Sequence, residues 1–181
     1  MSLLPGPREA PTAKPGCPEH LVPVVNQHLL SIWQAHPEWL AEPQNKEVFP
    51  SLDAFKQRIW AWAFLAGFDV THKGAGTRAS PALRLWCIHH GAETQNTRNL
   101  KDRVKKDKDS KIISDRKVDY SNVAQLECLW KIRCSWKQLG IRNSRVFGFK
   151  VTYKGKGTSH SHSILPNPLK YVKHCKDTIK C

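Results

Sequence analysis

The segment ECLWKIRCSWK, residues 127–137, has the most regular alternation of apolar and polar side chains in the chain. Because successive side chains of a β-strand point to opposite faces, this pattern predicts a strand with one buried and one basic face. Similar runs occur at residues 68–72, 83–88 and 145–153, and short connections predict an antiparallel sheet with one buried side. The core face of segment 127–137 would hold Cys128, Trp130, Ile132, Cys134 and Trp136, and its basic face Lys131, Arg133, Ser135 and Lys137.

A helix is predicted immediately before these strands. Ser51 is a favourable N-cap, and Gly67 stands where a left-handed residue would end the helix. Between them, apolar residues recur at the i, i+3, i+4 spacing of one helix face, which predicts a buried stripe. The stripe consists of Leu52, Phe55, Ile59, Trp62, Ala63 and Ala66. The predicted fold class is therefore α+β, a small antiparallel sheet with a preceding helix.

The remaining composition divides the chain into four parts. Residues 1–20 are rich in proline and glycine, which predicts a disordered leader. Residues 21–48 are expected to be a helical arm, with a short helix followed by a turn. The main domain is assigned to residues 49–168, and residues 169–181 to a basic tail.

Within the main domain, residues 92–120 alternate lysine and arginine with aspartate and lack a periodic apolar pattern. This composition predicts a long polar insertion that is mobile unless bound. The basic run from Lys101 to Lys111 fits a nuclear-import signal or an arm that follows phosphates. It fits a solvated loop equally well.

The charge of the chain points to a polyanionic partner. The 181 residues contain 29 Lys and Arg against 15 Asp and Glu, a formal net charge of +14. Each phosphate that such a protein neutralises releases a condensed counterion, so nucleic acid is the first candidate and an anionic membrane surface the alternative. No apolar run reaches the about 18–20 residues that span a bilayer. Residues 1–18 lack a secretory signal, so the six cysteines are expected to be thiols or metal ligands rather than disulfides.

A candidate metal site is centred on the sequence His160-Ser161-His162. In an extended segment residues i and i+2 lie on the same face, so both imidazoles can reach one ion. Cys87 and Cys128 lie at the ends of two neighbouring strands, where their thiolates could converge on the same ion. Zinc prefers four such nitrogen and sulfur ligands in a tetrahedron.

The spacing leaves other ligand sets open. Cys134 lies on the same strand face as Cys128 and is a rival to it, but it lies deeper in the strand and is interpreted as a small buried apolar residue. His89 or His90 could replace one of the two histidines. Cys17 and His20 are close to each other but have no further partner nearby. A closed set of four ligands is typical of a structural site, whereas a hydrolytic site needs an open position and a general base. We therefore expect no enzymatic activity.

A glycine-rich basic turn, KGAGTR, spans residues 73–78. It lacks the Gly-Lys-Ser/Thr ending of a phosphate-binding P-loop. We interpret it as a hairpin loop whose Lys73 and Arg78 contact a DNA backbone, with a solvated loop as the equally simple alternative.

The order of these segments resembles the far-red-impaired-response type of DNA-binding domain, of the WRKY and glial-cells-missing zinc-finger superfamily, often found at the N-terminus of Mutator-like transposases. The resemblance covers residues 49–168. It is carried by the helix from Ser51 to Ala63, by Gly67-Phe68-Asp69-Val70, Leu85-Trp86-Cys87 and Cys128-Leu129-Trp130-Lys131-Ile132, and by His160-Ser161-His162. Leu129 stands where the family often has proline, Ser161 where it often has asparagine, and the insertion at 92–120 is unusually long.

The resemblance implies a four- to five-stranded antiparallel sheet closed by one Cys2His2 zinc, with Cys87, Cys128, His160 and His162 as ligands. It also implies that an edge strand enters the DNA major groove, for which the hairpin from Val70 to Arg84 is the candidate. No WRKYGQK heptapeptide is present, so a target sequence does not follow.

The expected function is that of a nuclear, zinc-dependent protein that binds double-stranded DNA, either a transcription regulator or a transposase-derived protein. We expect neither a membrane nor a small-molecule substrate as its partner. The alternative is a zinc-stabilised protein-interaction or effector-like module. The DNA contacts are assigned to Lys73, Arg78, Arg84, Lys131 and Arg133.

Overall fold

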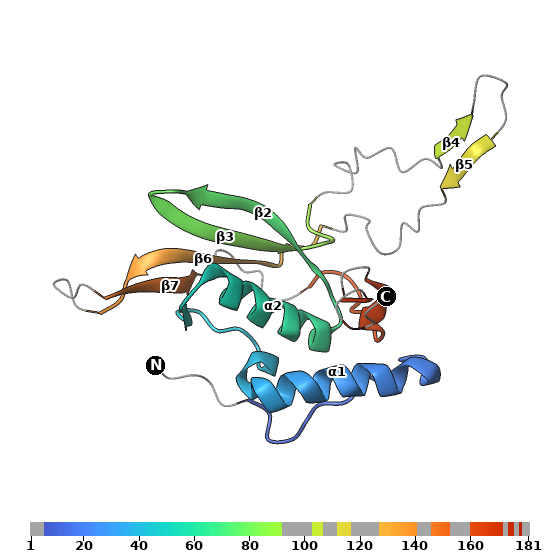
Figure 1. Ribbon diagram of the computed structural model, residues 1–181, viewed down its shortest axis with the longest axis horizontal. Helices are drawn as coiled ribbons and strands as arrows, with labels where there is room; N and C mark the ends of the chain where they lie inside the picture. Colours follow the sequence, from blue (N-terminus) through green and yellow to red (C-terminus); the bar gives the residue numbers. More distant parts are fainter. Residues whose placement is uncertain are drawn as a thin grey trace.

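The structure is a computed structural model that describes residues 6–91, 103–106, 112–116, 127–140, 146–152, 160–171, 174–175 and 178. No helix in these ranges combines the length and apolar character that crossing a membrane requires. The elements, shown in Figure 1, are in chain order η1 (Glu19–Leu21), α1 (Val22–Ala35), η2 (Pro37–Leu40), β1 (Val48–Phe49), α2 (Leu52–Ala66), β2 (Val70–Thr77), β3 (Ser80–Cys87), β4 (Arg103–Lys106), β5 (Ile112–Arg116), β6 (Lys131–Gln138), β7 (Phe147–Thr152) and η5 (Pro168–Lys170).

Five strands form one antiparallel sheet in the order β1-β7-β6-β3-β2. The predictions of an α+β fold and of an antiparallel sheet are therefore confirmed. Leu85 pairs with Ile132, and Leu83 pairs with Cys134, so the apolar positions of β3 and β6 coincide on one face. Strand β2 is an edge strand, and the β2–β3 hairpin extends from the body of the domain (Figure 1).

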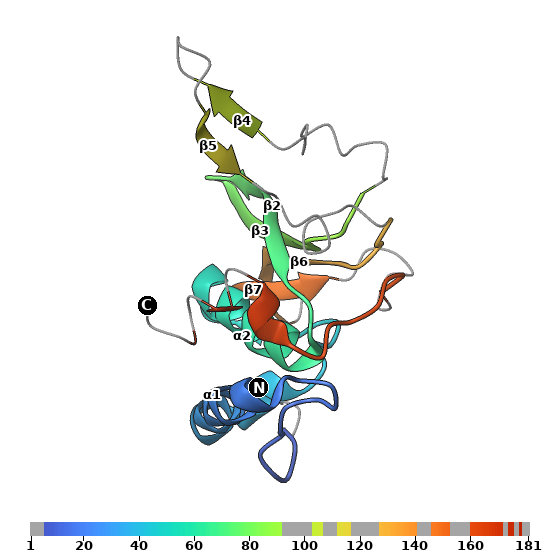
Figure 2. The same cartoon turned by 90° about the vertical axis from the view of Figure 1, so that its right-hand side faces the viewer.

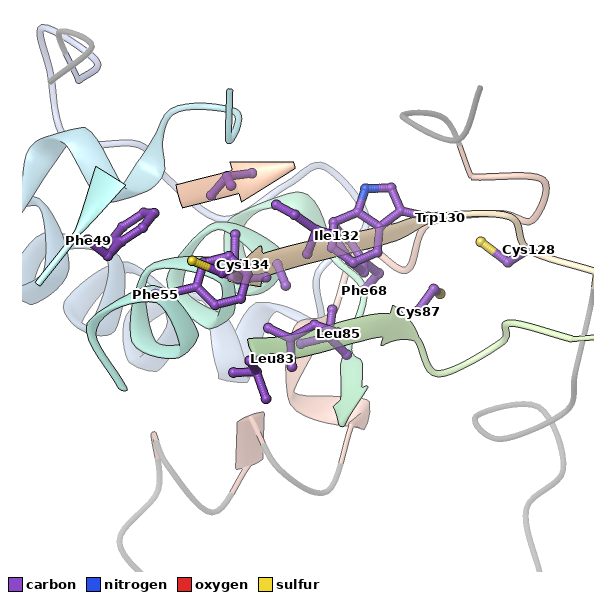
Figure 3. Close-up of a cluster of buried hydrophobic side chains, with 14 residues drawn as sticks. Phe49, Phe55, Phe68, Leu83, Leu85, Cys87, Cys128, Trp130, Ile132 and Cys134 are labelled. Carbon is purple, nitrogen blue, oxygen red and sulfur yellow. The ribbon is translucent and has the colours of Figure 1, made fainter. Parts of the chain in front are cut away.

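Helix α2 covers the apolar face of this sheet. The Ser51 hydroxyl accepts a hydrogen bond from the Ala54 amide at 3.0 Å, and Gly67 ends the helix with φ 81°, as the sequence predicts. Phe55 and Ile59 of α2 are fully buried. Figure 3 shows the core that these residues share with the strands, formed by Phe49, Phe55, Ile59, Ala63, Phe68, Val70, Leu83, Leu85, Cys87, Cys128, Trp130, Ile132, Cys134 and Val151.

The core does not reach the far end of the sheet. Trp136, predicted on the core face, is 39% exposed, and Phe147 on the neighbouring strand is 48% exposed. The ends of β6 and β7 extend beyond α2 (Figure 1), so the helix does not cover them. The two rings instead stack on each other, with centroids 6.0 Å apart.

The leader differs from the disordered segment expected for residues 1–20. Cys17 is buried in a second apolar cluster with Val25 and Leu29 of α1. The Trp33 indole donates a hydrogen bond to the carbonyl of Pro7 at 2.9 Å, and Lys14 Nζ donates to the Ala66 carbonyl at 2.7 Å. Two effects favour the packing of this segment despite its composition. Its prolines reduce the conformational entropy of the unfolded chain. The hydrogen bond from Lys14 satisfies a backbone carbonyl at the C-terminal end of α2 that has no partner within the helix. Residues 1–5 lie outside the described ranges.

The expected polar insertion at 92–120 contains a two-stranded antiparallel pair. Strand β4 pairs with β5, with Arg103 opposite Arg116 and Val104 opposite Asp115. This pair forms a sheet of its own, apart from the five-stranded sheet (Figure 1) and at the end of the molecule away from α1 (Figure 2). The other residues of the insertion lie outside the described ranges.

The described part of the basic tail at 169–181 is packed on the domain. Leu169, Tyr171 and His174 are buried, and His174 Nε2 donates a hydrogen bond to the Phe68 carbonyl at 2.8 Å. The lysine-rich composition of this segment gave no indication of these buried residues, which lie next to exposed basic residues such as Lys170. The domain boundaries assigned from the sequence stay predictions.

Candidate metal centre

The structure brings Cys87, Cys128, His160 and His162 together from three separate segments. Cys87 ends β3, Cys128 lies in the segment before β6, and the two histidines follow β7 in the chain. A backbone bridge between His90 and Cys128 holds the first two segments side by side. Figure 3 shows the two cysteines facing each other where the strands end. One ligand atom from each of the four residues lies within 4.8 Å of all the others.

The spacing of these atoms fits one small cation in a tetrahedron. Cys87 Sγ lies 3.2 Å from His162 Nε2, and Cys128 Sγ lies 3.4 Å from His160 Nδ1. The two histidine nitrogens are 3.1 Å apart. Metal bonds of about 2.3 Å to sulfur and about 2.0 Å to nitrogen place tetrahedral ligand atoms about 3.3–3.8 Å apart. Both thiols are free, so no disulfide competes with a metal.

The pKa values of the two thiols are shifted in opposite directions. The pKa of Cys87 is raised, mainly by its hydrogen bond with Cys128 and to a smaller extent by burial. The hydrogen bond from Cys87 lowers the pKa of Cys128 to about 3, and His160 contributes in the same direction. The pair therefore releases a first proton more readily than a second, and a cation bound to both sulfurs would displace both protons.

The two imidazoles are held by different neighbours. His162 Nδ1 donates to the Ser163 carbonyl at 3.0 Å, which leaves Nε2 free to point into the cluster. The ring of His160 packs on Phe68, with centroids 4.1 Å apart, and stacks on Trp130 at 5.7 Å. Aromatic core residues thus fix one ligand and a backbone carbonyl the other.

The alternative ligands considered from the sequence lie outside the cluster. Cys134 is in the core, where burial raises the pKa of its thiol to about 12. His90 stacks on Trp86, with centroids 3.9 Å apart. Cys17 is buried in the second apolar cluster, and His20 is exposed. Cys134 and Cys128 share a strand face, and the deeper position of Cys134 in the strand agrees with its place in the core.

His89 supports the cluster rather than joining it. The centroid of its ring lies 4.5 Å from the centroid of the His162 ring. Tyr171 OH lies 3.4 Å from His89 Nε2, so the C-terminal segment contacts the surroundings of the ligands. Sequence reasoning missed Tyr171, and only its aromatic character within a basic segment could have indicated an anchor.

The residues predicted to contact DNA fall into two groups. Arg84, Lys131 and Arg133 line a hollow of about 200 Å³ in the sheet face opposite α2. Lys73 lies on the edge strand β2, and Arg78 is exposed in the turn between β2 and β3. The structure therefore brings the first three together and places the other two along the hairpin.

A scan against protein-family models, a search of curated proteins and a search of solved structures each found no match for this chain.

Proposed function

We propose that this chain is a zinc-dependent, nuclear protein that binds double-stranded DNA, either a transcription regulator or a transposase-derived protein. The observation that carries the proposal is the charge of the main sheet. Strands β2, β3, β6 and β7 contain no aspartate or glutamate, and their lysines and arginines lie on the face opposite α2 or on the edge hairpin. A sheet of this kind attracts phosphates at its open face and its edge.

The donor set favours zinc over other cations. Two sulfurs and two imidazole nitrogens suit a borderline-soft ion in a tetrahedron, whereas calcium and magnesium require oxygen ligands. The four protein ligands fill all positions, so the ion would hold the chain together rather than activate water. This arrangement supports a structural zinc and a non-enzymatic role.

The β2–β3 hairpin is the proposed groove-reading element. The major groove of B-DNA is about 12 Å wide and admits a two-stranded β-ribbon. Lys73 and Arg78 lie along the β2–β3 ribbon, and a Cβ at Gly76 would collide with the Ser80 carbonyl. The close approach of the two strands at Gly76 keeps the ribbon narrow. Zinc bound at the base of β3 would fix the ribbon relative to the open face of the sheet.

The proposal is tested by measuring the affinity of the zinc-loaded chain for mixed-sequence duplex DNA over a range of salt concentrations. Affinity should fall steeply with salt. Arg78→Gln should make the negative slope of log K against log salt shallower by about 0.9. Arg8→Gln removes the same charge from an exposed position of the leader and should leave the slope unchanged. Undetectable binding at low salt would refute DNA binding. Selection from random oligonucleotides then separates sequence-specific from purely electrostatic binding.

A second candidate function is a zinc-stabilised protein-interaction or effector-like module. The exposed stack of Trp136 and Phe147 favours it, because exposed aromatic pairs are common at protein interfaces. In that case the chain binds one zinc per molecule but shows no salt-dependent affinity for duplex DNA.

A further inference from the structure

A hollow of about 200 Å³ opens on the sheet face opposite α2, lined by Arg84, Trp86, Lys131, Ile132 and Arg133. These residues belong to β3 and β6, which have a paired strand on each side. The backbone beneath the hollow is therefore hydrogen-bonded from both directions. A site built on such strands keeps its geometry better than one built on a loop.

The positive charge in the hollow has no counter-charge among the described residues. Arg84 pairs directly with Arg133, and like charges opposite each other destabilise an antiparallel pair. Lys131 lies two pairs further along, opposite Trp86 and on the same face of the sheet. Other cationic residues of the described ranges do have acidic partners, for example Arg58 with Glu47.

One donor in the hollow is also unsatisfied. Arg133 Nε is buried and has no hydrogen-bond partner among the described residues. A buried donor without an acceptor is unfavourable, and so is the repulsion between the two guanidinium groups. An anion with several acceptor oxygens would relieve both.

The shape and the walls favour a phosphate group. Two guanidinium groups and an ammonium group offer donors in several directions, which a tetrahedral phosphate matches. The Trp86 indole forms an apolar wall, and His90 stacked against it holds the ring in place. Lys73 Nζ lies 5.9 Å from the centroid of the same indole and adds a cation at the β2 side. The apolar wall reduces the exposure of the hollow to water and strengthens the attraction of an anion.

We propose that the hollow formed by Arg84, Lys131 and Arg133 beside Trp86 is a binding site for a single phosphate group, and that in a DNA complex it holds one backbone phosphate. The second part rests on the proposed function. A phosphate held at this fixed point would set the position of the hairpin along the duplex, since phosphate contacts determine the register of a DNA-binding protein.

The phosphate site is tested first without DNA. The zinc-loaded full chain is titrated with inorganic phosphate while the arginine Nε–H resonances are followed by NMR, with sodium chloride at matched ionic strength as the control. We expect a saturable shift of Arg133 with phosphate and none with chloride. Arg133→Gln and the more exposed Arg84→Gln should each weaken phosphate binding by about tenfold or more.

Lys137→Gln is the matched variant. It removes one positive charge from the same strand, at an exposed position that does not line the hollow. It should bind phosphate as the unmodified chain does. A linear shift that chloride reproduces, or equal phosphate affinity in all variants, would overturn the inference.

The same variants then identify the source of the phosphate. If Arg133→Gln weakens duplex binding more than Lys137→Gln does, the hollow holds a backbone phosphate. If phosphate saturates the hollow but no duplex binds, the proposed function fails, and so does the proposal that the hollow holds a DNA backbone phosphate. The site then belongs to a free phosphorylated ligand. If duplex binds but phosphate never saturates and the variants behave alike, the inference is wrong while the proposed function stands.

Discussion

Replacing Cys128 with alanine is expected to weaken zinc binding strongly, whereas the same replacement at Cys134 is not. Both residues are fully buried cysteines on one face of the same segment, which makes Cys134→Ala a matched control. Only Cys128 contributes to the group of four ligand atoms within 4.8 Å of one another. The two variants therefore differ in metal ligation and not in the kind of side chain lost.

The expected sizes of the two effects differ clearly. Structural zinc sites contribute about 10–16 kcal/mol at neutral pH, so one of four ligands accounts for about 2.5–4 kcal/mol if they share equally. This corresponds to a loss of zinc affinity on the order of 10²–10³-fold for Cys128→Ala. Because a domain of this size is stable by only about 5–15 kcal/mol, the sheet should also unfold at a lower temperature. Cys134→Ala removes one buried atom and should cost about 1 kcal/mol without a change in zinc affinity.

Zinc affinity is measured by competition with a chelating dye, zinc content by elemental analysis, and folding by circular dichroism during heating. The unmodified chain and Cys134→Ala should each retain one zinc. The reasoning is refuted if Cys128→Ala binds zinc within tenfold of the unmodified chain, or if Cys134→Ala loses zinc to the same extent.

Three further predictions concern the packing of Gly67, His174 and Cys134. Gly67→Ala should destabilise the fold by at least about 1–2 kcal/mol in urea unfolding, because a Cβ at this left-handed position would collide with the Leu165 carbonyl; a stability within 0.5 kcal/mol of the unmodified chain would contradict the described packing. His174→Ala should cost about 1–3 kcal/mol in the same assay, since it leaves the buried Phe68 carbonyl without its donor; an unchanged stability would mean that the C-terminal segment does not pack there. The Cys134 thiol, whose pKa is raised to about 12 by burial, should resist iodoacetamide at pH 8 in the folded chain, because only the thiolate reacts; mass spectrometry detecting alkylation as fast as in the denatured chain would disprove this.

Local sequence patterns predicted the elements of the main sheet well. The alternation in residues 127–137 and the stripe between Ser51 and Gly67 depend only on the geometry of strands and helices. Both patterns therefore reappear in β6 and α2. Trp136 deviates from the prediction because its burial depends on how far α2 extends over the sheet, which no pattern within the strand records.

The ends of the chain were predicted less well. The leader and the tail lack periodicity, and their order comes from single anchors such as Trp33 to Pro7 and His174 to Phe68. Contacts of this kind join residues that are far apart in the sequence, and the local pattern of a single sequence gives no sign of them.

The sequence by itself determined which residues are capable of ligating a metal and on which strand face the cations lie. Only the tertiary structure decided which cysteine completes the cluster, because Cys87 and His162 are 75 positions apart in the chain. Cys134 shares a face with Cys128, but at about 3.3 Å per residue six positions of extended chain place the two thiols about 20 Å apart. A single ion can therefore reach one of them and not the other, and the pairing of β3 with β6 places Cys128, rather than Cys134, at the strand end beside Cys87.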